Sequence, residues 1–237
     1  VIGTVGDAME SLGYVVDDGQ EILIRLEDDR CTVSLDASGR ELFKRGYRTE
    51  HVGAPIRESI AASVLKLVSP TDLTDPCCGS GTFVIEHALM LKGAAPRPGR
   101  TYPLEAWANF DREVFDAQTT SERDVTAVIR GFDRDERAIE VATANAKRAG
   151  VENLVTFGVR EVVELEPDAV VVTNPPYDQR IADPALSVIA QLDNHPLATF
   201  IVPGAWRGSG RVLARFQNGG TPVKLVRASA WPDDASS

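Results

Sequence analysis

Apolar residues recur along this chain at two different spacings, and the two spacings alternate. Short runs typical of β-strands lie at 72–75, 127–132, 155–157, 169–173, 199–202 and 223–227. Apolar positions three or four residues apart, which are typical of helices, occupy 54–69, 83–91 and 135–149. Strands that alternate with helices through short connections predict a doubly wound α/β sheet. The run at 169–173 is almost wholly apolar, as expected for a central parallel strand covered on both faces.

Proline, glycine and aspartate mark the ends of two predicted helices. Pro55 lies in the expected first turn of one helix, where proline is tolerated, and Pro70 ends that helix. Asp135 is suited to cap the start of the other helix, and Gly150 is suited to close its end.

Two parts of the chain stand outside this alternation. Residues 21–27 and 31–35 alternate apolar and polar side chains on either side of an acidic turn, which predicts a β-hairpin. Two strands are too few for a core of their own, so residues 1–45 are expected to be the end of a larger N-terminal domain. An added amphipathic helix is expected at 105–120.

The net charge of −10 argues against nucleic-acid binding over the whole surface, so any contact with RNA or DNA has to be local. Two basic segments are candidates for such a contact. The first contains Lys44, Arg45 and Arg48. The second, residues 204–230, has no acidic residue and contains five basic ones: Arg207, Arg211, Arg215, Lys224 and Arg227.

The number and spacing of the cysteine, histidine and apolar residues argue against several classes of protein. Three cysteines cannot form a disulfide framework or a four-ligand zinc site, and the three histidines show no metal spacing, so no metal is expected. No apolar run approaches the roughly 18 residues of a membrane helix, so no membrane partner is expected. These features predict a cytoplasmic protein.

A glycine-rich turn follows the strand at 72–75 and opens the helix at 83–91. Gly79 and Gly81 allow the backbone to turn tightly and to approach a ligand closely. Such a turn often only connects a strand to a helix, but here a carboxylate, Asp75, stands at the end of the strand. An anion there disfavours a phosphate and suits the cationic amino-acid part of S-adenosylmethionine (SAM). Asp133, at the end of the next strand, is suited to accept hydrogen bonds from ribose hydroxyls.

The tetrapeptide Asn174-Pro175-Pro176-Tyr177 directly follows the apolar strand at 169–173. In isolation it would read as a stiff turn, but at the carboxyl end of a central strand it suits a chemical role. The Asn174 side-chain oxygen and the Pro175 carbonyl can accept both protons of an exocyclic amino group, which directs the nitrogen lone pair at a sulfonium methyl. The prolines fix φ near −65° and hold that carbonyl in place. Tyr177 can stack on a planar acceptor.

The turn at 75–83, Asp-Pro-Cys-Cys-Gly-Ser-Gly-Thr-Phe, closely resembles the SAM loop of the THUMP-associated RNA guanine-N2 methyltransferases. The segments 44–48 and 54–59 resemble that family's linker and the start of its first catalytic helix. This resemblance implies a seven-stranded, Rossmann-like class I methyltransferase sheet in residues 46–237, preceded in 1–45 by the remnant of a THUMP-like RNA-binding region. Three positions depart from the family pattern: Cys77, His87 and Asp178.

The resemblance also implies the cofactor, the partner and the site. The cofactor is SAM, and the acceptor is guanine N2 in a structured ribosomal or transfer RNA, which is captured with the help of a more complete N-terminal domain. The expected catalytic residues are Asn174, Pro175, Pro176 and Tyr177. The expected cofactor-binding residues are Asp75, Cys77, Gly79, Ser80, Gly81, Thr82, Phe83, Asp133, Glu161 (near the adenine) and Asn174.

Other interpretations stay open at this point. Asn-Pro-Pro-Tyr also fits a DNA adenine-N6 or cytosine-N4 methyltransferase and a protein-glutamine N5 methyltransferase. A catalytically inactive SAM-binding module associated with RNA is an alternative of another class, although such a module would not need the Asn174 geometry. An NAD-dependent oxidoreductase is disfavoured because the third glycine of the dinucleotide fingerprint is missing.

Overall fold

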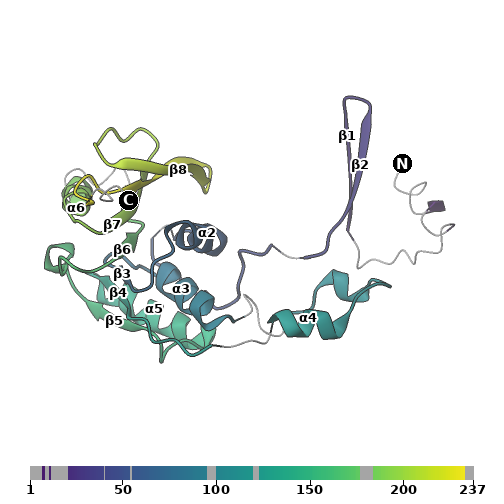
Figure 1. Ribbon diagram of the computed structural model, residues 1–237, viewed down its shortest axis with the longest axis horizontal. Helices are drawn as coiled ribbons and strands as arrows, with labels where there is room; N and C mark the ends of the chain where they lie inside the picture. The colour runs from purple at the N-terminus through teal and green to yellow at the C-terminus, as the bar shows by residue number, and fades with distance from the viewer. Residues whose placement is uncertain are drawn as a thin grey trace. The chain divides into compact units, whose positions relative to one another are not determined.

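The computed structural model describes residues 7–8, 11, 21–39, 41–53, 55–94, 100–119, 123–176 and 184–232. The chain divides into two compact units (Figure 1). One unit comprises residues 1–42 and 97–118, and the other comprises residues 43–96 and 119–237. The larger unit is therefore interrupted by a segment that packs with the N-terminal residues, which the sequence did not predict.

The smaller unit contains the predicted hairpin. Strands β1 (Ile22–Glu27) and β2 (Arg30–Leu35) pair antiparallel, and both turn residues, Asp28 and Asp29, adopt positive φ. Two successive left-handed residues match the right-handed twist of the flanking strands. The added helix predicted at 105–120 is divided into a 3₁₀ turn, η1 (Pro103–Ala106), and a shorter helix, α4 (Arg112–Thr119).

The larger unit is built around a seven-stranded sheet of order β5-β4-β3-β6-β7-β9-β8. The strands from β5 to β7 pair parallel, whereas β9 pairs antiparallel with both β7 and β8. Their bounds are β3 (Leu73–Asp75), β4 (Ile129–Asp133), β5 (Thr156–Val159), β6 (Val171–Thr173), β7 (Ala198–Pro203), β8 (Arg211–Asn218) and β9 (Thr221–Arg227). This order confirms the predicted doubly wound, seven-stranded fold.

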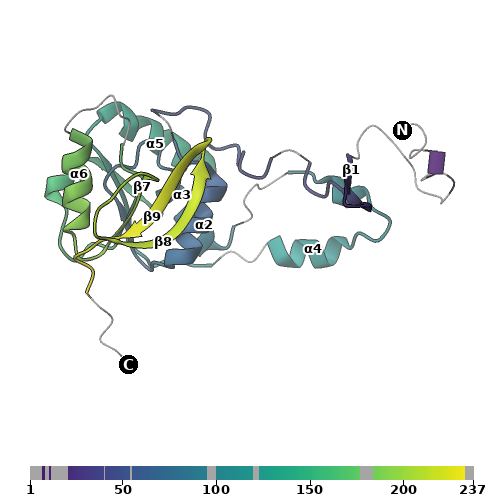
Figure 2. The same cartoon turned by 90° about the horizontal axis from the view of Figure 1, so that it is seen from above.

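Helices cover both faces of this sheet, as Figures 1 and 2 show. The buried residues of α2 (Glu58–Val68), α3 (Thr82–Lys92) and α5 (Glu136–Ala149) form one apolar core with the sheet. On the opposite face, α6 (Pro184–Asp193) and the 3₁₀ turn η2 (Val162–Glu164) form a second core with β6, β7 and β9. Successive side chains of β6 supply the two cores: Val172 packs in the first core and Val171 in the second.

Two local predictions need correction, and one is confirmed. Pro55 precedes helix α2 instead of lying in its first turn, because α2 begins only at Glu58. Strand β8 has no counterpart among the predicted strands, since its alternation is broken by a bulge between Val212 and Ala214. Helix α5 is capped as predicted: the Asp135 side chain accepts a hydrogen bond from the Arg137 amide.

The contact between β4 and β5 yields the first prediction. A Cβ added at Gly131 would lie 2.7 Å from two ring carbons of Phe157, a separation that packed atoms do not tolerate. We expect Gly131→Ala to lower the free energy of unfolding by about 1–3 kcal/mol, as overpacking of a core does. Urea denaturation measures this change.

Gly158 on the neighbouring strand is the matched control. A Cβ there would meet Phe132 at 3.4 and 3.5 Å, which is ordinary van der Waals contact. Gly158→Ala should therefore cost clearly less than Gly131→Ala. Equal losses from the two variants would contradict the packing described here.

Candidate active site

The sheet order brings three polar side chains to one edge. Strands β4, β3 and β6 are neighbours and run parallel, so their carboxyl ends lie side by side. Asp133 ends β4, Asp75 ends β3, and Asn174 directly follows β6. In an open α/β sheet this edge is where ligands bind.

Asp75 is a buried carboxylate, only 2% exposed. Its Oδ1 atom accepts hydrogen bonds from the Thr173 hydroxyl at 2.5 Å and from the Cys77 amide at 3.1 Å. Burial raises the pKa of Asp75 to about 7, and the nearby charge of Asp133 adds to this rise, although the two hydrogen bonds oppose it. The carboxyl group is therefore poised to lose its proton when a positive charge binds beside it.

The glycine-rich turn takes the shape that the sequence predicted. Gly79 and Gly81 adopt φ of 51° and 82°, in the left-handed region that favours glycine. At Gly81 a Cβ would also crowd Ala142 at 3.1 Å, so the turn lies directly against helix α5. Asp133 fixes the same turn, because its Oδ2 atom accepts a hydrogen bond from the Gly79 amide at 2.9 Å.

Three predicted cofactor residues point their side chains into the protein. The Ser80 hydroxyl accepts a hydrogen bond from the Val52 amide at 3.0 Å, and the Thr82 hydroxyl accepts one from Arg48 at 3.2 Å. Phe83 is 1% exposed and belongs to the core under α3. These side chains hold the turn in place. Ser80, Thr82 and Phe83 can therefore contact a ligand only through their backbone atoms.

Cys77, also predicted to bind the cofactor, is a neutral thiol. Burial raises the pKa of Cys77, and the charges of Asp75 and Asp133 raise it further. The neighbouring Cys78 thiol has a raised pKa for the same reasons. Since the thiolate is the reactive form, neither residue is suited to act as a nucleophile.

Within the described part of the chain, Asn174 has a hydrogen-bond acceptor without a donor. Its side-chain oxygen is shielded from solvent, and no hydrogen bond reaches it from the part of the chain that the structure describes. Pro175 is buried and Pro176 is exposed. Tyr177, the last residue of the predicted motif, and Asp178 lie outside the described residues. A buried acceptor without a partner costs free energy, which a ligand that donates a hydrogen bond can recover.

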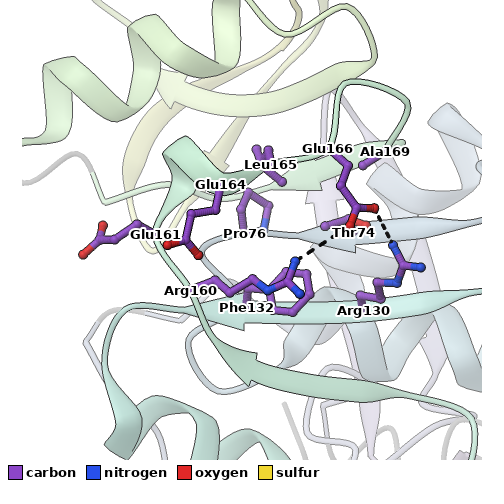
Figure 3. A pocket seen from close by; sticks show the side chains of 10 residues that line it. All are labelled: Thr74, Pro76, Arg130, Phe132, Arg160, Glu161, Glu164, Leu165, Glu166 and Ala169. Atoms are coloured by element: carbon purple, nitrogen blue, oxygen red, sulfur yellow. Dashed lines mark hydrogen bonds and ion pairs between the residues drawn. The ribbon is translucent and has the colours of Figure 1, made fainter.

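A small pocket opens beside the ends of β3 and β4, and Glu161 lies on its wall (Figure 3). The Arg160 guanidinium packs over the Phe132 ring at 4.5 Å. Glu166 holds the far wall through ion pairs with Arg130 at 3.1 Å and Arg160 at 3.9 Å. The cavity volume is about 10 Å³, so these side chains have to move apart to admit a nucleoside.

The first predicted RNA-contact segment needs correction. Arg48 pairs with Glu58 at 2.9 Å, and Arg45 pairs with Glu86 at 3.4 Å, with the two arginine side chains only 14% and 10% exposed. Tyr47 also donates a hydrogen bond to Glu86. These pairs fasten the start of the larger unit to α2 and α3, so Arg45 and Arg48 are not available to phosphates. No local pattern in the sequence indicates their partners, which lie on helices α2 and α3.

The described residues contain neither a metal-binding group nor a membrane-spanning helix. No group of three or more His, Cys, Asp or Glu residues there could hold a metal ion. No helix in the same residues is long and apolar enough to cross a membrane. His87, at a position that departs from the family pattern, is buried and contacts the Thr71 carbonyl oxygen at 3.0 Å.

The sheet order and the polar edge together define a class I, Rossmann-like methyltransferase domain. The model of the family described as RMKL-like, methyltransferase domain, matches residues 45–192. The chain therefore belongs to this family.

Relatives and solved structures agree with this assignment. The ribosomal RNA large subunit methyltransferase K/L of Aliivibrio salmonicida (strain LFI1238) is 42% identical over 182 residues, covering 69% of this chain and 26% of that protein. The protein of the same name from Aliivibrio fischeri (strain MJ11) is 40% identical over 181 residues, with the same coverage. The chain thus spans about a quarter of the length of these relatives.

Two solved structures resemble most of the chain. SMU.472, complexed with SAH, superposes with a TM-score of 0.75 at 26% identity, covering 98% of this chain and 69% of that chain. The second is a protein from Listeria monocytogenes str. 4b F2365, described as a predicted N6-adenine-specific DNA methylase. It superposes with a TM-score of 0.72 at 27% identity, covering 96% of this chain and 66% of that chain.

The raised pKa of Asp75 makes stability depend on pH. In the folded chain Asp75 keeps its proton up to about pH 7, whereas its usual value is 3.8. The unfolded chain therefore binds fewer protons across this interval, and this group lowers stability as pH rises from about 4 to 7. We expect Asp75→Asn to remove this loss and to be more stable than the wild type by about 1–4 kcal/mol at pH 8.

Urea denaturation between pH 5 and pH 8 measures the difference between wild type and variant. That difference should grow with pH, because other titrating groups contribute equally to both proteins. Asp168→Asn, which removes an exposed carboxylate near β6, is the control and should follow the wild type. Parallel profiles for the wild type and Asp75→Asn would contradict the description of Asp75.

Proposed function

We propose that the larger unit binds SAM at the carboxyl ends of β3 and β4. The residues present fit this molecule. The turn at Gly79 and Gly81 has the backbone shape and close packing of a ligand cradle, and helix α3 begins there, so its positive dipole end can face the methionine carboxylate. Asp75 suits the cationic part of SAM, and Asp133 suits the ribose hydroxyls. The complex of SMU.472 with SAH supports this choice.

The proposed reaction is methyl transfer to an exocyclic amino group, and the observation that carries this proposal is the side-chain oxygen of Asn174, which has no hydrogen-bond partner among the described residues. An amino group is a poor nucleophile when its lone pair is conjugated with a ring. Asn174 and the Pro175 carbonyl would accept its two protons and favour a more pyramidal nitrogen. SAM supplies an electrophilic methyl group on a sulfonium.

No strong base is required before the transfer. The amino group would attack while it keeps both protons, the bond between the methyl group and the sulfur would break to leave SAH, and water would then take one proton from the positively charged nitrogen. The contribution of the chain is therefore orientation, and intramolecular models allow about 7–11 kcal/mol for such positioning. Asn174 and Pro175 act by holding the acceptor, and Tyr177 by stacking on its ring.

Guanine N2 of ribosomal RNA is the acceptor that we favour. The relatives that share 40–42% identity are named ribosomal RNA large subunit methyltransferases. A ribosomal or transfer RNA substrate places the proposed reaction in the cytoplasm, and residues 1–45 would belong to a region that helps to capture the RNA. The name of the Listeria monocytogenes protein keeps adenine N6 of DNA as the alternative acceptor.

Removal of the Asp133 carboxylate should weaken cofactor binding. Asp133→Ala deletes both the proposed ribose acceptor and the hydrogen bond to Gly79, so we expect the affinity for SAH to fall by roughly 1–3 kcal/mol. Isothermal titration calorimetry measures this, with Asp168→Asn as the charge control. Equal affinity in wild type and Asp133→Ala would remove Asp133 from the site.

Removal of the Asn174 side chain should impair the chemical step. We expect Asn174→Ala to bind SAH almost as the wild type does and to transfer methyl at least about a hundredfold more slowly, the size of effect seen when a transition-state hydrogen bond is lost. Single-turnover transfer from tritiated SAM to a guanosine-containing RNA gives the rate. Asn194→Ala, at an exposed asparagine, is the matched control.

Nucleoside analysis of the labelled RNA then locates the methyl group. A methyl on carbon or on a ribose oxygen would contradict the amino-group proposal. A methyl on adenine N6 would keep the mechanism and overturn the choice of guanine.

A further inference from the structure

Strands β8 and β9 form a hairpin at the end of the strand order of the sheet (Figure 2), and three cations lie on it or just before it. The strand register pairs Arg215 directly with Lys224, so both side chains lie on the same face. Arg207 lies on the connection that precedes β8. We call Arg207, Arg215 and Lys224 the cation cluster.

Two members of the cation cluster meet at one backbone atom. Lys224 Nζ donates to the Trp206 carbonyl oxygen at 2.9 Å, and an Arg207 nitrogen lies 3.5 Å from the same oxygen. Lys224 is only 6% exposed. Its pKa is lowered, first by loss of solvent and then by the positive charges of Arg215 and Arg207. The positive charges of Arg215 and Arg207 therefore act on Lys224, which is itself shielded from solvent.

The repulsion is not relieved by the surrounding sequence. Residues 204–230 contain no acidic residue, and among the described residues no carboxylate forms an ion pair with any member of the cation cluster. Like charges directly opposite each other across two strands destabilise a sheet. An anion that binds here would turn this cost into a favourable interaction.

The cation cluster lies near the carboxyl ends of the parallel strands, as the candidate active site does. Lys224 pairs with Val202 near the carboxyl end of β7, and Thr173, which precedes Asn174, pairs with Phe200. Strands β6, β7 and β9 are successive neighbours, so Lys224 is two strand spacings from Asn174, or roughly 10 Å across the sheet. That span suits a phosphate close to a base held at Asn174.

The other two basic residues of the hairpin are placed differently. Arg211 pairs with Arg227, which lies opposite Thr199 near the start of β7 and therefore away from the catalytic edge. The Arg227 guanidinium also packs over the Trp231 ring at 4.4 Å. Arg211 and Arg215 are thus two exposed arginines on one strand, and only Arg215 belongs to the cation cluster.

We propose that the exposed members of the cation cluster, Arg207 and Arg215, bind the RNA phosphate backbone beside the target nucleotide, with buried Lys224 adding positive charge behind them, and so position the acceptor base over Asn174. This inference rests on the proposed function. It divides the basic segment at 204–230 into a part that contacts RNA and a part that does not. The expected contact is with phosphate oxygens, which position the RNA without reading its sequence.

The test compares Arg215→Gln with Arg211→Gln in the 237-residue chain, since each removes one exposed charge from β8. The probe is a fluorescein-labelled, guanosine-containing RNA stem-loop, and fluorescence anisotropy is recorded from 50 to 300 mM KCl. We expect Arg215→Gln to weaken RNA binding about threefold to tenfold and to reduce the slope of log affinity against log salt by about 0.7–0.9. Arg211→Gln should leave both near the wild-type values.

Two accompanying measurements separate the possible outcomes. Arg215→Gln should not lower Tm, because it removes a repulsive pair, and both variants should bind SAH as the wild type does. Equal effects of the two variants, no effect of either, no RNA binding by the wild type at 50 mM KCl, or binding to phosphatidylserine vesicles in place of RNA would overturn the cation cluster as an RNA site. A failure of SAH binding or of the Asn174→Ala result would instead overturn the proposed function.

Discussion

The hydrogen bond between Thr173 and Asp75 joins the two halves of the site. Asp75 ends β3 and begins the glycine-rich turn, whereas Thr173 ends β6 and precedes Asn174. The same carboxylate also accepts a hydrogen bond from the Cys77 amide. One buried group therefore fixes the start of the turn and the position of Asn174. Burial of this carboxyl group raises its pKa and is unfavourable for its charged form. The same buried group sets the position of the proposed methyl donor relative to the acceptor.

Charges of opposite sign are separated along the catalytic edge. Asp75, Asp133 and Glu161 lie near the ends of β3, β4 and β5, where a cationic cofactor would bind. The cation cluster lies at the end of β7, where a phosphate backbone would approach. For the proposed function, this arrangement would let a chain with a net charge of −10 act on a polyanion, because the attraction would be confined to one part of one edge.

The sequence predicted the fold and the composition of the edge because these depend on local patterns. Alternating strands and helices set the sheet, and the turn at 75–83 and the segment after β6 carry their own signatures. The partners of Arg45 and Arg48 could not be predicted, since Glu86 and Glu58 lie 41 and 10 residues further along the chain and meet them only after folding. Strand β8 was missed because its arginines and its bulge conceal the alternation, although Gly219 and Gly220, both with positive φ, mark the hairpin turn.

The interruption of the larger unit by residues 97–118 limits how the protein can be dissected. Those residues contain a small aromatic cluster, in which the ring centroid of Phe115 lies 5.8 Å from that of Tyr102 and 5.4 Å from that of Phe110. In the same unit, Arg100 donates a hydrogen bond to the Ser38 carbonyl. Truncation at residue 42 would leave this cluster attached to the catalytic part without its native neighbours. Isolation of the larger unit therefore requires two cuts and a linker in place of residues 97–118, so a gene fragment that starts at residue 43 is the wrong unit for expression.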